Sequence, residues 1–297
     1  MSIKSILNIF GGEAYELNAL TAALAITHTS RATLRILHLV EPPVVSDVTG
    51  IGIYSGLVYG DLATVERVDQ ETKALTQAAK TYAEAYCHHQ NVPLLSEGTQ
   101  VTMGQAQAFF RAVTGDVRDN LPREASTADL IVTDYDNRPE GDLSVILTGL
   151  FNADRPVLAV PRQPASAVRT EGYCQTIMFA WDGSVPSGKA LREAVAHMLH
   201  ATNIFVVRVM SDDGAVDEQV RSDLITYLRS HCIDAEFLFV ERDKRKVGEI
   251  LLQEATRLKA DMLVMGAYGR GHISEMLLGG VTDYVLKHAN LPLLLAH

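Results

Sequence analysis

The sequence is poor in several features from which a function is often inferred. It has three cysteines in 297 residues, Cys87, Cys174 and Cys232. They form no C-x-x-C pair, which excludes a disulfide framework and a zinc cluster of the usual spacing. No run approaches the ~18 consecutive apolar residues of a membrane span, and the first apolar stretch is too short for a signal peptide. We therefore expect a cytoplasmic protein without membrane contacts.

Positive charge is also in short supply. The chain has 26 Lys and Arg residues against 36 Asp and Glu residues, for a net charge of −10. Binding to nucleic acid requires a basic face, so we expect no nucleic-acid partner. Hydrophobic residues make up 47% of the chain and charged residues 21%, which is the composition of a globular protein. The length fits two domains of roughly 150 residues each.

Motifs for the common catalytic and metal sites are missing as well. The phosphate loop G-x4-G-K-[ST] does not occur, and no set of nucleophile, base and orienting group is recognisable. Gly50–Gly56 is glycine-rich, but its spacing is not that of a dinucleotide-binding turn and we interpret it as a loop. His88 and Asp212 lack partners at metal-ligand spacing. We expect no catalytic residues and no metal site.

An internal repeat is what the sequence does contain. Residues 129–161 and 261–297 both open with Asp and an apolar run, and both close with X-Pro and a second apolar run. This predicts two similar domains in tandem, at 1–162 and 173–297. The segment from Arg162 to Gly172 is polar and contains proline, as a domain boundary should.

Apolar runs and helical spacing alternate along both halves. In the second half we expect helices at Ser187–His200 (with Ser187 as N-cap), Val216–His231, about Val247–Leu258 and Gly280–Ala289. In the first half we expect a long helix at about Leu62–His88. Short apolar runs predict the strands, at Ile6–Phe10, Leu34–Val40, about Leu95–Val101, Leu130–Thr133, Val157–Val160, Thr176–Ala180, Asn203–Met210, Ala235–Val240, Asp261–Met265 and Leu291–Ala296. Such alternation indicates parallel sheets with helices on both faces.

The two copies differ in glycine content at one place. The second has Gly266, Gly269, Gly279 and Gly280 where the first has Asp134, Asn137 and the stretch around 147–149. Ligands of open α/β sheets bind at the carboxyl ends of the strands, and glycine lets a phosphate approach the backbone N–H groups of a helix start. These positions predict an anion site in the second domain.

Side chains around this predicted site fit a nucleotide. Asp182, after the first strand of the second domain, is a candidate acceptor for ribose hydroxyls, and Arg270 is a candidate donor to phosphate. Structural explanations stay open for each of them. The glycines can serve turns and caps, Asp182 can cap its turn, Arg270 can be a solvated loop residue, and Trp181 can be a packing residue.

These motifs resemble those of a known family. The family's signature G-x2-G-x9-G-[S/T] corresponds to Gly266, Gly269, Gly279 and Gly280, and its D-G-S-x-x-S turn corresponds to residues 182–187. The second half is thus similar to a universal stress protein domain, and the first half shares the outline of one. One departure is that Gly280 stands where the family has Ser or Thr, which removes a hydroxyl donor.

The resemblance implies a specific fold and ligand. It implies two tandem Rossmann-like domains of the HUP type, each with a five-stranded parallel sheet of order 3-2-1-4-5 and helices on both faces. It further implies ATP, with Mg²⁺ as a possible companion, bound in the second domain only. The cofactor-binding residues it implies are Ala180, Trp181, Asp182, Val209, Met265, Gly266, Gly269, Arg270, Gly279, Gly280, Val281 and Thr282.

Function and assembly follow as expectations. We expect a stress-response or regulatory protein that binds an adenine nucleotide with little or no catalysis. A chaperone-like interaction protein without nucleotide and a weak ATPase remain alternatives. The resemblance implies that fifth strands pair, here within one chain. We also expect a homodimer, for which the insertion Pro42–Gly60 is a candidate contact or lid.

Overall fold

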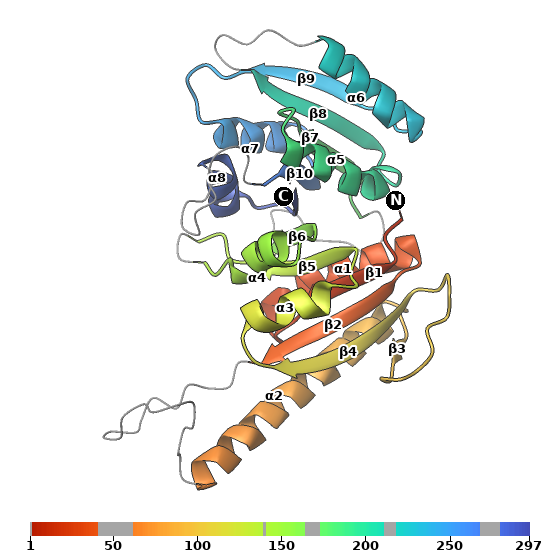
Figure 1. Cartoon of the computed structure of the whole chain (residues 1–297), viewed down its shortest axis with the longest axis vertical. Coiled ribbons are helices and arrows are strands. Elements are labelled where there is room, and N and C mark those ends of the chain that lie inside the picture. The colour runs from red at the N-terminus through yellow and green to blue at the C-terminus, as the bar shows by residue number, and fades with distance from the viewer. Residues whose placement is uncertain (1, 41–61, 139–140, 164–172, 211–217, 268–279) are drawn as a thin grey trace, which may run out of the picture.

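A single eleven-stranded sheet runs through the chain (Figure 1). The structure, a computed structural model, describes residues 2–40, 62–138, 141–163, 173–210, 218–267 and 280–297. The insertion Pro42–Gly60 and most of the predicted linker therefore lie outside the described residues. The strand order is β3-β4-β2-β1-β5-β6-β11-β10-β7-β8-β9.

The strands of each half follow the predicted 3-2-1-4-5 order. The first half adds one very short strand, β3, at its edge, and all neighbours within a half are parallel. The strands are β1 Ser5–Ile9, β2 Thr33–Val40, β3 Leu94–Leu95, β4 Gln107–Thr114, β5 Leu130–Tyr135, β6 Val157–Pro161, β7 Thr176–Ala180, β8 Asn203–Met210, β9 Glu236–Glu241, β10 Met262–Gly266 and β11 Leu293–Ala296.

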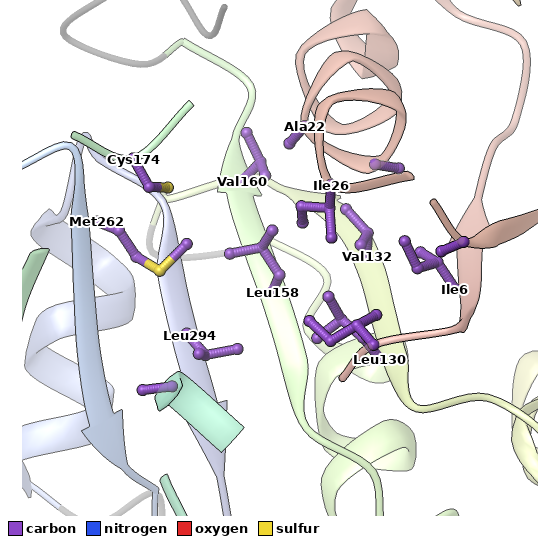
Figure 2. Packing of buried hydrophobic residues seen from close by; sticks show 14 of the residues in the cluster. Ile6, Ala22, Ile26, Leu130, Val132, Leu158, Val160, Cys174, Met262 and Leu294 are labelled. Carbon is purple, nitrogen blue, oxygen red and sulfur yellow. The ribbon is translucent and has the colours of Figure 1, made fainter. Parts of the chain in front are cut away.

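The fifth strands of the two halves pair antiparallel, as predicted. Leu294 of β11 stands opposite Leu158 of β6. Both strands are buried along their whole length, so each covers the apolar edge that the other would otherwise expose. Around this junction, Leu158 and Val160 pack in the same core as Met262 and Leu294 (Figure 2). The two halves therefore share one core.

Helices cover both faces of the sheet. α1 Leu17–Ser30, α2 Leu62–His89, α5 Val185–Met198 and α6 Glu218–Ser230 pack on one face. α3 Val117–Ala125, α4 Ser144–Leu147, the π-helical turn η2 Thr148–Asn152, α7 Val247–Arg257 and α8 Gly280–His288 pack on the other. A 3-10 turn, η1 Ala14–Glu16, precedes α1. In the part of the chain that the structure describes, none of these helices combines the length and apolarity needed to cross a bilayer.

Two local predictions are wrong. The third strand of the first half is Gln107–Thr114, not Leu95–Val101, because the buried positions that pair with β2 are Ala108 and Phe110. Residues 96–105 are exposed instead. The helix after β7 begins two residues early, with Ser184 rather than Ser187 as N-cap. The Ser184 hydroxyl accepts from the Ser187 N–H at 3.2 Å, which satisfies one free donor of the first turn.

A buried histidine makes stability depend on pH. His197 of α5 is 6% exposed, and burial, helped by the charge of His200, lowers its pKa from 6.5 to about 4. The unfolded chain therefore binds a proton near pH 6.5 that the folded chain binds only near pH 4. The stability that neutral His197 contributes is fully present above pH 6.5. It is lost as the pH falls from 6.5 to about 4, by about 3 kcal/mol in total. Urea unfolding at pH 7 and pH 5 measures the larger part of this loss, about 2 kcal/mol.

A His197→Leu variant provides the comparison for this pH dependence. It has no group to protonate at this position, so its unfolding free energy should change less between the two pH values. Replacement of the exposed His200 by Leu serves as the control. This variant should lose nearly as much unfolding free energy between pH 7 and pH 5 as the parent does. A parental protein that is as stable at pH 5 as at pH 7 would refute the assignment.

Candidate functional site

The first element of the site is the turn after β7. The Trp181 N–H donates to the Val207 carbonyl of β8 at 2.9 Å, which extends the sheet by one residue. The chain then turns at Gly183, whose φ is +77°, a left-handed value that favours glycine. Ala180 is buried at the strand end, whereas Asp182 is exposed. The turn thus presents a carboxylate at the carboxyl edge of the sheet.

Hydrogen bonds hold the Asp182 carboxylate in its ionised form. Desolvation of the carboxylate by its neighbours in the turn would by itself raise its pKa, but hydrogen bonds from Ser184 and Ser187 outweigh this and keep the pKa below its usual value. One of them runs from the Ser184 N–H to Asp182 Oδ1 at 2.9 Å. An ionised carboxylate only accepts hydrogen bonds, so Asp182 suits a ligand hydroxyl. The hydrogen bond to Ser184 agrees with the capping explanation, because through it Asp182 orders the turn before α5.

Trp181 is a packing residue in this structure. It is half-buried against the core, and its ring lies 5.7 Å from that of Phe179. Its indole Nε1 is buried, and among the described residues no acceptor is paired with it.

Gly266 is required for close packing. A Cβ at this position would lie 2.4 Å from the Ser187 backbone N and 2.6 Å from the Pro186 carbonyl carbon. The N-terminal turn of α5 therefore rests directly on the end of β10. Glycine is needed here for a reason independent of any phosphate, and the Cβ side of Gly266 is not open to a ligand.

Gly280 has the opposite surroundings. It is the first residue of α8, it is exposed, and no atom that the structure describes lies within 4 Å of where its Cβ would be. Val281 is half-buried and Thr282 is buried in the same turn. Among the described residues, nothing packs against the Cβ position at this helix start. Gly269, Arg270 and Gly279 lie outside the described residues.

Val209 and Met265 sit at the ends of their strands. Val209 is half-buried and in register with Val240 of the edge strand β9. Met265 is buried and in register with Ala180. The described part of the predicted set therefore lies at the carboxyl ends of three adjacent strands and at the first turn of α8.

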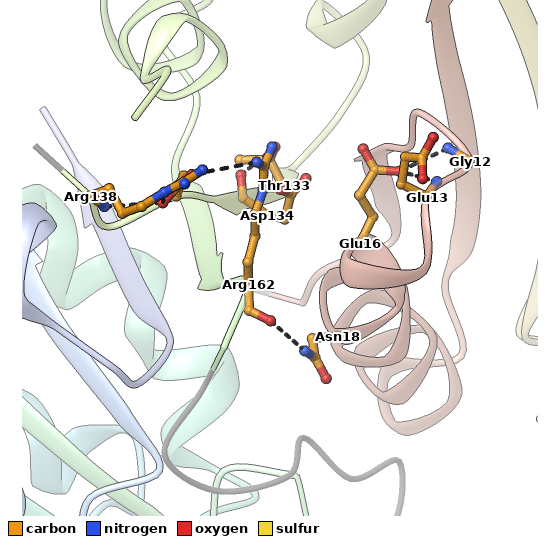
Figure 3. A network of polar contacts seen from close by, with 9 residues as sticks. Gly12, Glu13, Glu16, Asn18, Thr133, Asp134, Arg138 and Arg162 are labelled. Carbon is orange, nitrogen blue, oxygen red and sulfur yellow. Dashed lines mark hydrogen bonds and ion pairs between the residues drawn. The ribbon is translucent and has the colours of Figure 1, made fainter. Parts of the chain in front are cut away.

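The turn after β1 in the first domain has the same backbone geometry as the turn after β7. At the strand ends of the first domain, however, charged side chains of that domain bind the backbone and one another. The Phe10 N–H donates to the Leu37 carbonyl at 2.9 Å, as Trp181 donates in the second domain, and Gly12 has a φ of +101° two residues later, as Gly183 does. Glu16 accepts from the backbone here, and Asp134 pairs with Arg162 (Figure 3). Neither Glu16 nor Arg162 was predicted. The E-x-x-E spacing of Glu13 and Glu16, a variant of the capping box, was the available signal.

A separate hollow of about 620 Å³ lies between the domains. Its charges are mixed: Lys189 and Arg192 face Asp129, Asp154 and Glu193. Lys189 Nζ donates to the His297 carbonyl at 2.7 Å and lies 3.8 Å from Asp154. The hollow contains none of the predicted site residues.

Comparison with known proteins identifies the family of the second domain. The model of the Universal stress protein family matches residues 174–297. A segment of 43 residues is 44% identical to Universal stress protein Slr1101 of Synechocystis sp.; the match covers 14% of this chain and 40% of that protein. The chain thus spans less than half the length of this curated relative.

Solved structures extend the likeness to the whole chain. A universal stress protein from Archaeoglobus fulgidus DSM 4304 is 13% identical, with a TM-score of 0.68 over 99% of this chain and 96% of that one. Protein PA1789 of Pseudomonas aeruginosa PAO1, described as functionally unknown, is 14% identical, with a TM-score of 0.57 over 99% and 92%. At such identities the likeness concerns the fold. Residues 174–297 thus match the Universal stress protein family, and the fold of the whole chain is similar to that of a solved universal stress protein.

Proposed function

We propose that this protein is a stress-response or regulatory protein that binds an adenine nucleotide, ATP above all, in residues 173–297. The observation that carries the proposal is the contrast between two equivalent strand ends. The second domain leaves Asp182 exposed, and no described atom lies within 4 Å of the Gly280 Cβ position at the start of α8. The first domain places Glu16 and the Asp134–Arg162 pair at its strand ends.

The proposed binding mode assigns each part of the nucleotide to one element. Asp182 accepts from the ribose hydroxyls, and the backbone at Val209 receives the adenine. The phosphates meet the first turn of α8, where backbone N–H groups without helical partners favour an anion. Gly269, Arg270 and Gly279 belong to the proposed phosphate contacts, and Mg²⁺ accompanies the phosphates. Since no nucleophile and base are paired among the described residues of this site, we propose binding with little or no hydrolysis.

Mass spectrometry of small molecules released from the purified, denatured chain tests this proposal. We expect an adenine nucleotide, and we expect protein stripped of it to take up added ATP. A chain that releases no nucleotide and takes up no ATP at millimolar concentration would contradict the proposal.

An interaction protein without nucleotide is the second candidate. Gly280 favours it, because the family's hydroxyl donor is missing at this position. A neutral hydrogen bond contributes only about 0.5–1.5 kcal/mol, however, so its loss weakens binding without abolishing it.

We also propose a homodimer located in the cytoplasm. The two fifth strands already pair with each other within the chain, so a dimer must use another surface. Sedimentation equilibrium measures the mass: twice the chain mass is expected, and a monomeric mass would contradict this part of the proposal alone.

A further inference from the structure

Most of the outer edge of strand β4 has no strand partner. β4 runs from Gln107 to Thr114, but β3 lies beside one end of it and pairs only with Ala108 and Phe109 (Figure 1). In the part of the chain that the structure describes, no strand pairs with the outer side of the remainder, Phe110–Thr114. An unpaired strand edge is a template for another extended chain.

The outward backbone groups of β4 belong to alternate residues. The Ala108 N–H points outward, since it donates to the Pro93 carbonyl beside β3 at 2.9 Å. Successive residues of a parallel strand direct their backbone groups to opposite sides, so the groups of Phe110, Ala112 and Thr114 point outward as well. Among the described residues, none of these outward groups has a partner. Each of these residues thus offers both a donor and an acceptor along the edge.

The side chains of this stretch leave the edge accessible. Ala112 and Thr114 are exposed, although they lie on the face of the sheet against which α1 and α2 pack. Helix α2 therefore does not cover them. On the opposite face, Arg111 is exposed and Val113 is half-buried. The described residues thus leave both sides of this edge open to an approaching chain.

Arginine side chains gather on the face that carries Arg111. Arg111 Nη1 lies 3.5 Å from Glu124 Oε2, and Arg123 Nη2 lies 3.3 Å from Glu124 Oε1. Both arginine side chains are more than half exposed, whereas Glu124 is buried. The next acidic residue after β4, Asp116, is bound as the N-cap of α3, where it accepts from the Arg118 N–H at 2.6 Å. One buried carboxylate therefore serves two arginines.

Arg35 of β2 adds to this positive charge. It is in register with Phe109, which places it on the same face as Arg111. Burial lowers the pKa of its guanidinium, Glu124 opposes this, and the charge of Arg111 lowers the pKa further. Its Nη2 is buried, and no described residue accepts a hydrogen bond from it. Guanidinium groups in such excess favour a partner that carries carboxylates.

The opposite edge of the sheet carries acidic residues instead. β9 begins at Glu236 and ends at Glu241, so a carboxylate stands at each end of this edge strand. Arg221 lies over the ring of Phe239 at 5.6 Å. Like charges at both ends of β9 would repel an acidic chain, so the two edges of the sheet favour different partners.

We propose that the outer edge of β4 binds an extended acidic segment of a partner protein, which adds a strand beside Phe110–Thr114 and places carboxylates against Arg111 and Arg123. In this mode of recognition, main-chain hydrogen bonds supply affinity and alternate side chains supply specificity. The edge includes none of the residues proposed for nucleotide binding, so the proposal does not depend on ATP.

A short peptide of alternating Glu and Val is the probe, and a peptide of alternating Lys and Val is its charge control. Fluorescence anisotropy of the labelled peptides measures their binding to the full-length chain. We expect the Glu peptide to bind roughly tenfold more tightly than the Lys peptide at low salt, and the difference to shrink as salt is added. Equal affinities, or no binding of the Glu peptide at millimolar concentration, would overturn the proposal.

A proline at the edge tests the strand pairing. Ala112→Pro removes an outward N–H and leaves the hydrogen bonds to β2 in place, and proline is tolerated on edge strands. It should weaken binding of the Glu peptide roughly tenfold, because it also blocks the neighbouring pairing. The matched Ala112→Ser variant retains the N–H and should bind as the parent does. Unchanged affinity in an Ala112→Pro variant with the parental circular dichroism would contradict the pairing.

N-methylated peptides give the same test without altering the protein, and they decide if Ala112→Pro does not fold. One peptide is methylated at the Glu nitrogens and the other at the Val nitrogens, so each retains N–H groups on one side only. Only one of them should bind, and which one reports whether the added strand is parallel or antiparallel to β4. Equal binding by both would overturn the proposal.

A second copy of this chain is the competing occupant of the edge. In that case Ala112→Pro should convert a dimer to a monomer in sedimentation equilibrium, and the Glu peptide should not bind the dimer. That result would overturn the assignment to a partner protein. A parent and an Ala112→Pro variant of the same mass, with peptide binding weakened in the variant, would support it.

Discussion

Replacement of Gly280 by Asp is expected to reduce ATP affinity about a hundredfold without disturbing the fold. The new carboxylate would stand at the helix start that we propose for the phosphates, and repulsion between like charges there costs about 3 kcal/mol. The fold should tolerate it, because no described atom lies within 4 Å of the Cβ position. An acidic residue in the first turn of a helix is also electrostatically favourable. Isothermal titration with ATP, together with urea unfolding, measures both effects.

Two further substitutions at Gly280 separate charge from size. Gly280→Ala adds a Cβ without charge and should bind ATP nearly as the parent does. Gly280→Ser restores the hydroxyl of the family signature and should improve the binding free energy by about 0.5–1.5 kcal/mol. If Gly280→Asp binds ATP as tightly as the parent, the start of α8 is not the phosphate site.

Replacement of Gly266 by Ala is expected to destabilise the protein by about 3 kcal/mol or more, whether or not ATP is present. The added Cβ would lie 2.4 Å from the Ser187 backbone N. Overpacking of this kind costs about 1–3 kcal/mol when side chains can move aside, and a backbone in the first turn of a helix moves less easily. Urea unfolding of the nucleotide-free protein measures the loss.

Gly188 offers a matched control one turn into α5. No described atom lies within 4 Å of its Cβ position, and alanine is the better helix former, so Gly188→Ala should stabilise the chain by up to about 1 kcal/mol. A Gly266→Ala variant as stable as the parent would show that α5 does not rest on β10 as described. This packing also means that a loss of ATP binding in a Gly266 variant cannot be assigned to phosphate contacts.

Much of the fold could be predicted because its central strands are buried on both faces. The apolar runs at Thr176–Ala180 and Asn203–Met210 match the observed strands residue for residue. The missed strand, Gln107–Thr114, ends in a partly exposed stretch that includes Arg111, so its apolar pattern is weaker. The early start of α5 was missed because Pro186, which reads as a turn residue, occupies the first helical turn, where proline is tolerated.

The candidate site was predictable in its composition but not in the roles of its residues. Glycine spacing located Gly266 and Gly280, yet only the structure shows that the first serves packing, whereas no described atom packs against the Cβ position of the second. The side-chain contacts at the strand ends of the first domain involve Glu16 and Arg162, which are 146 positions apart in the sequence and lie at the same edge of the sheet without touching (Figure 3). No local pattern connects two such residues.

Titration calorimetry of the full-length chain with ATP tests the central claim most directly. The account predicts one ATP per chain, bound in the second domain, with the same stoichiometry after Glu16→Gln and about a hundredfold weaker binding after Gly280→Asp. Two ATP molecules per chain, or one that still binds tightly after Gly280→Asp, would contradict it.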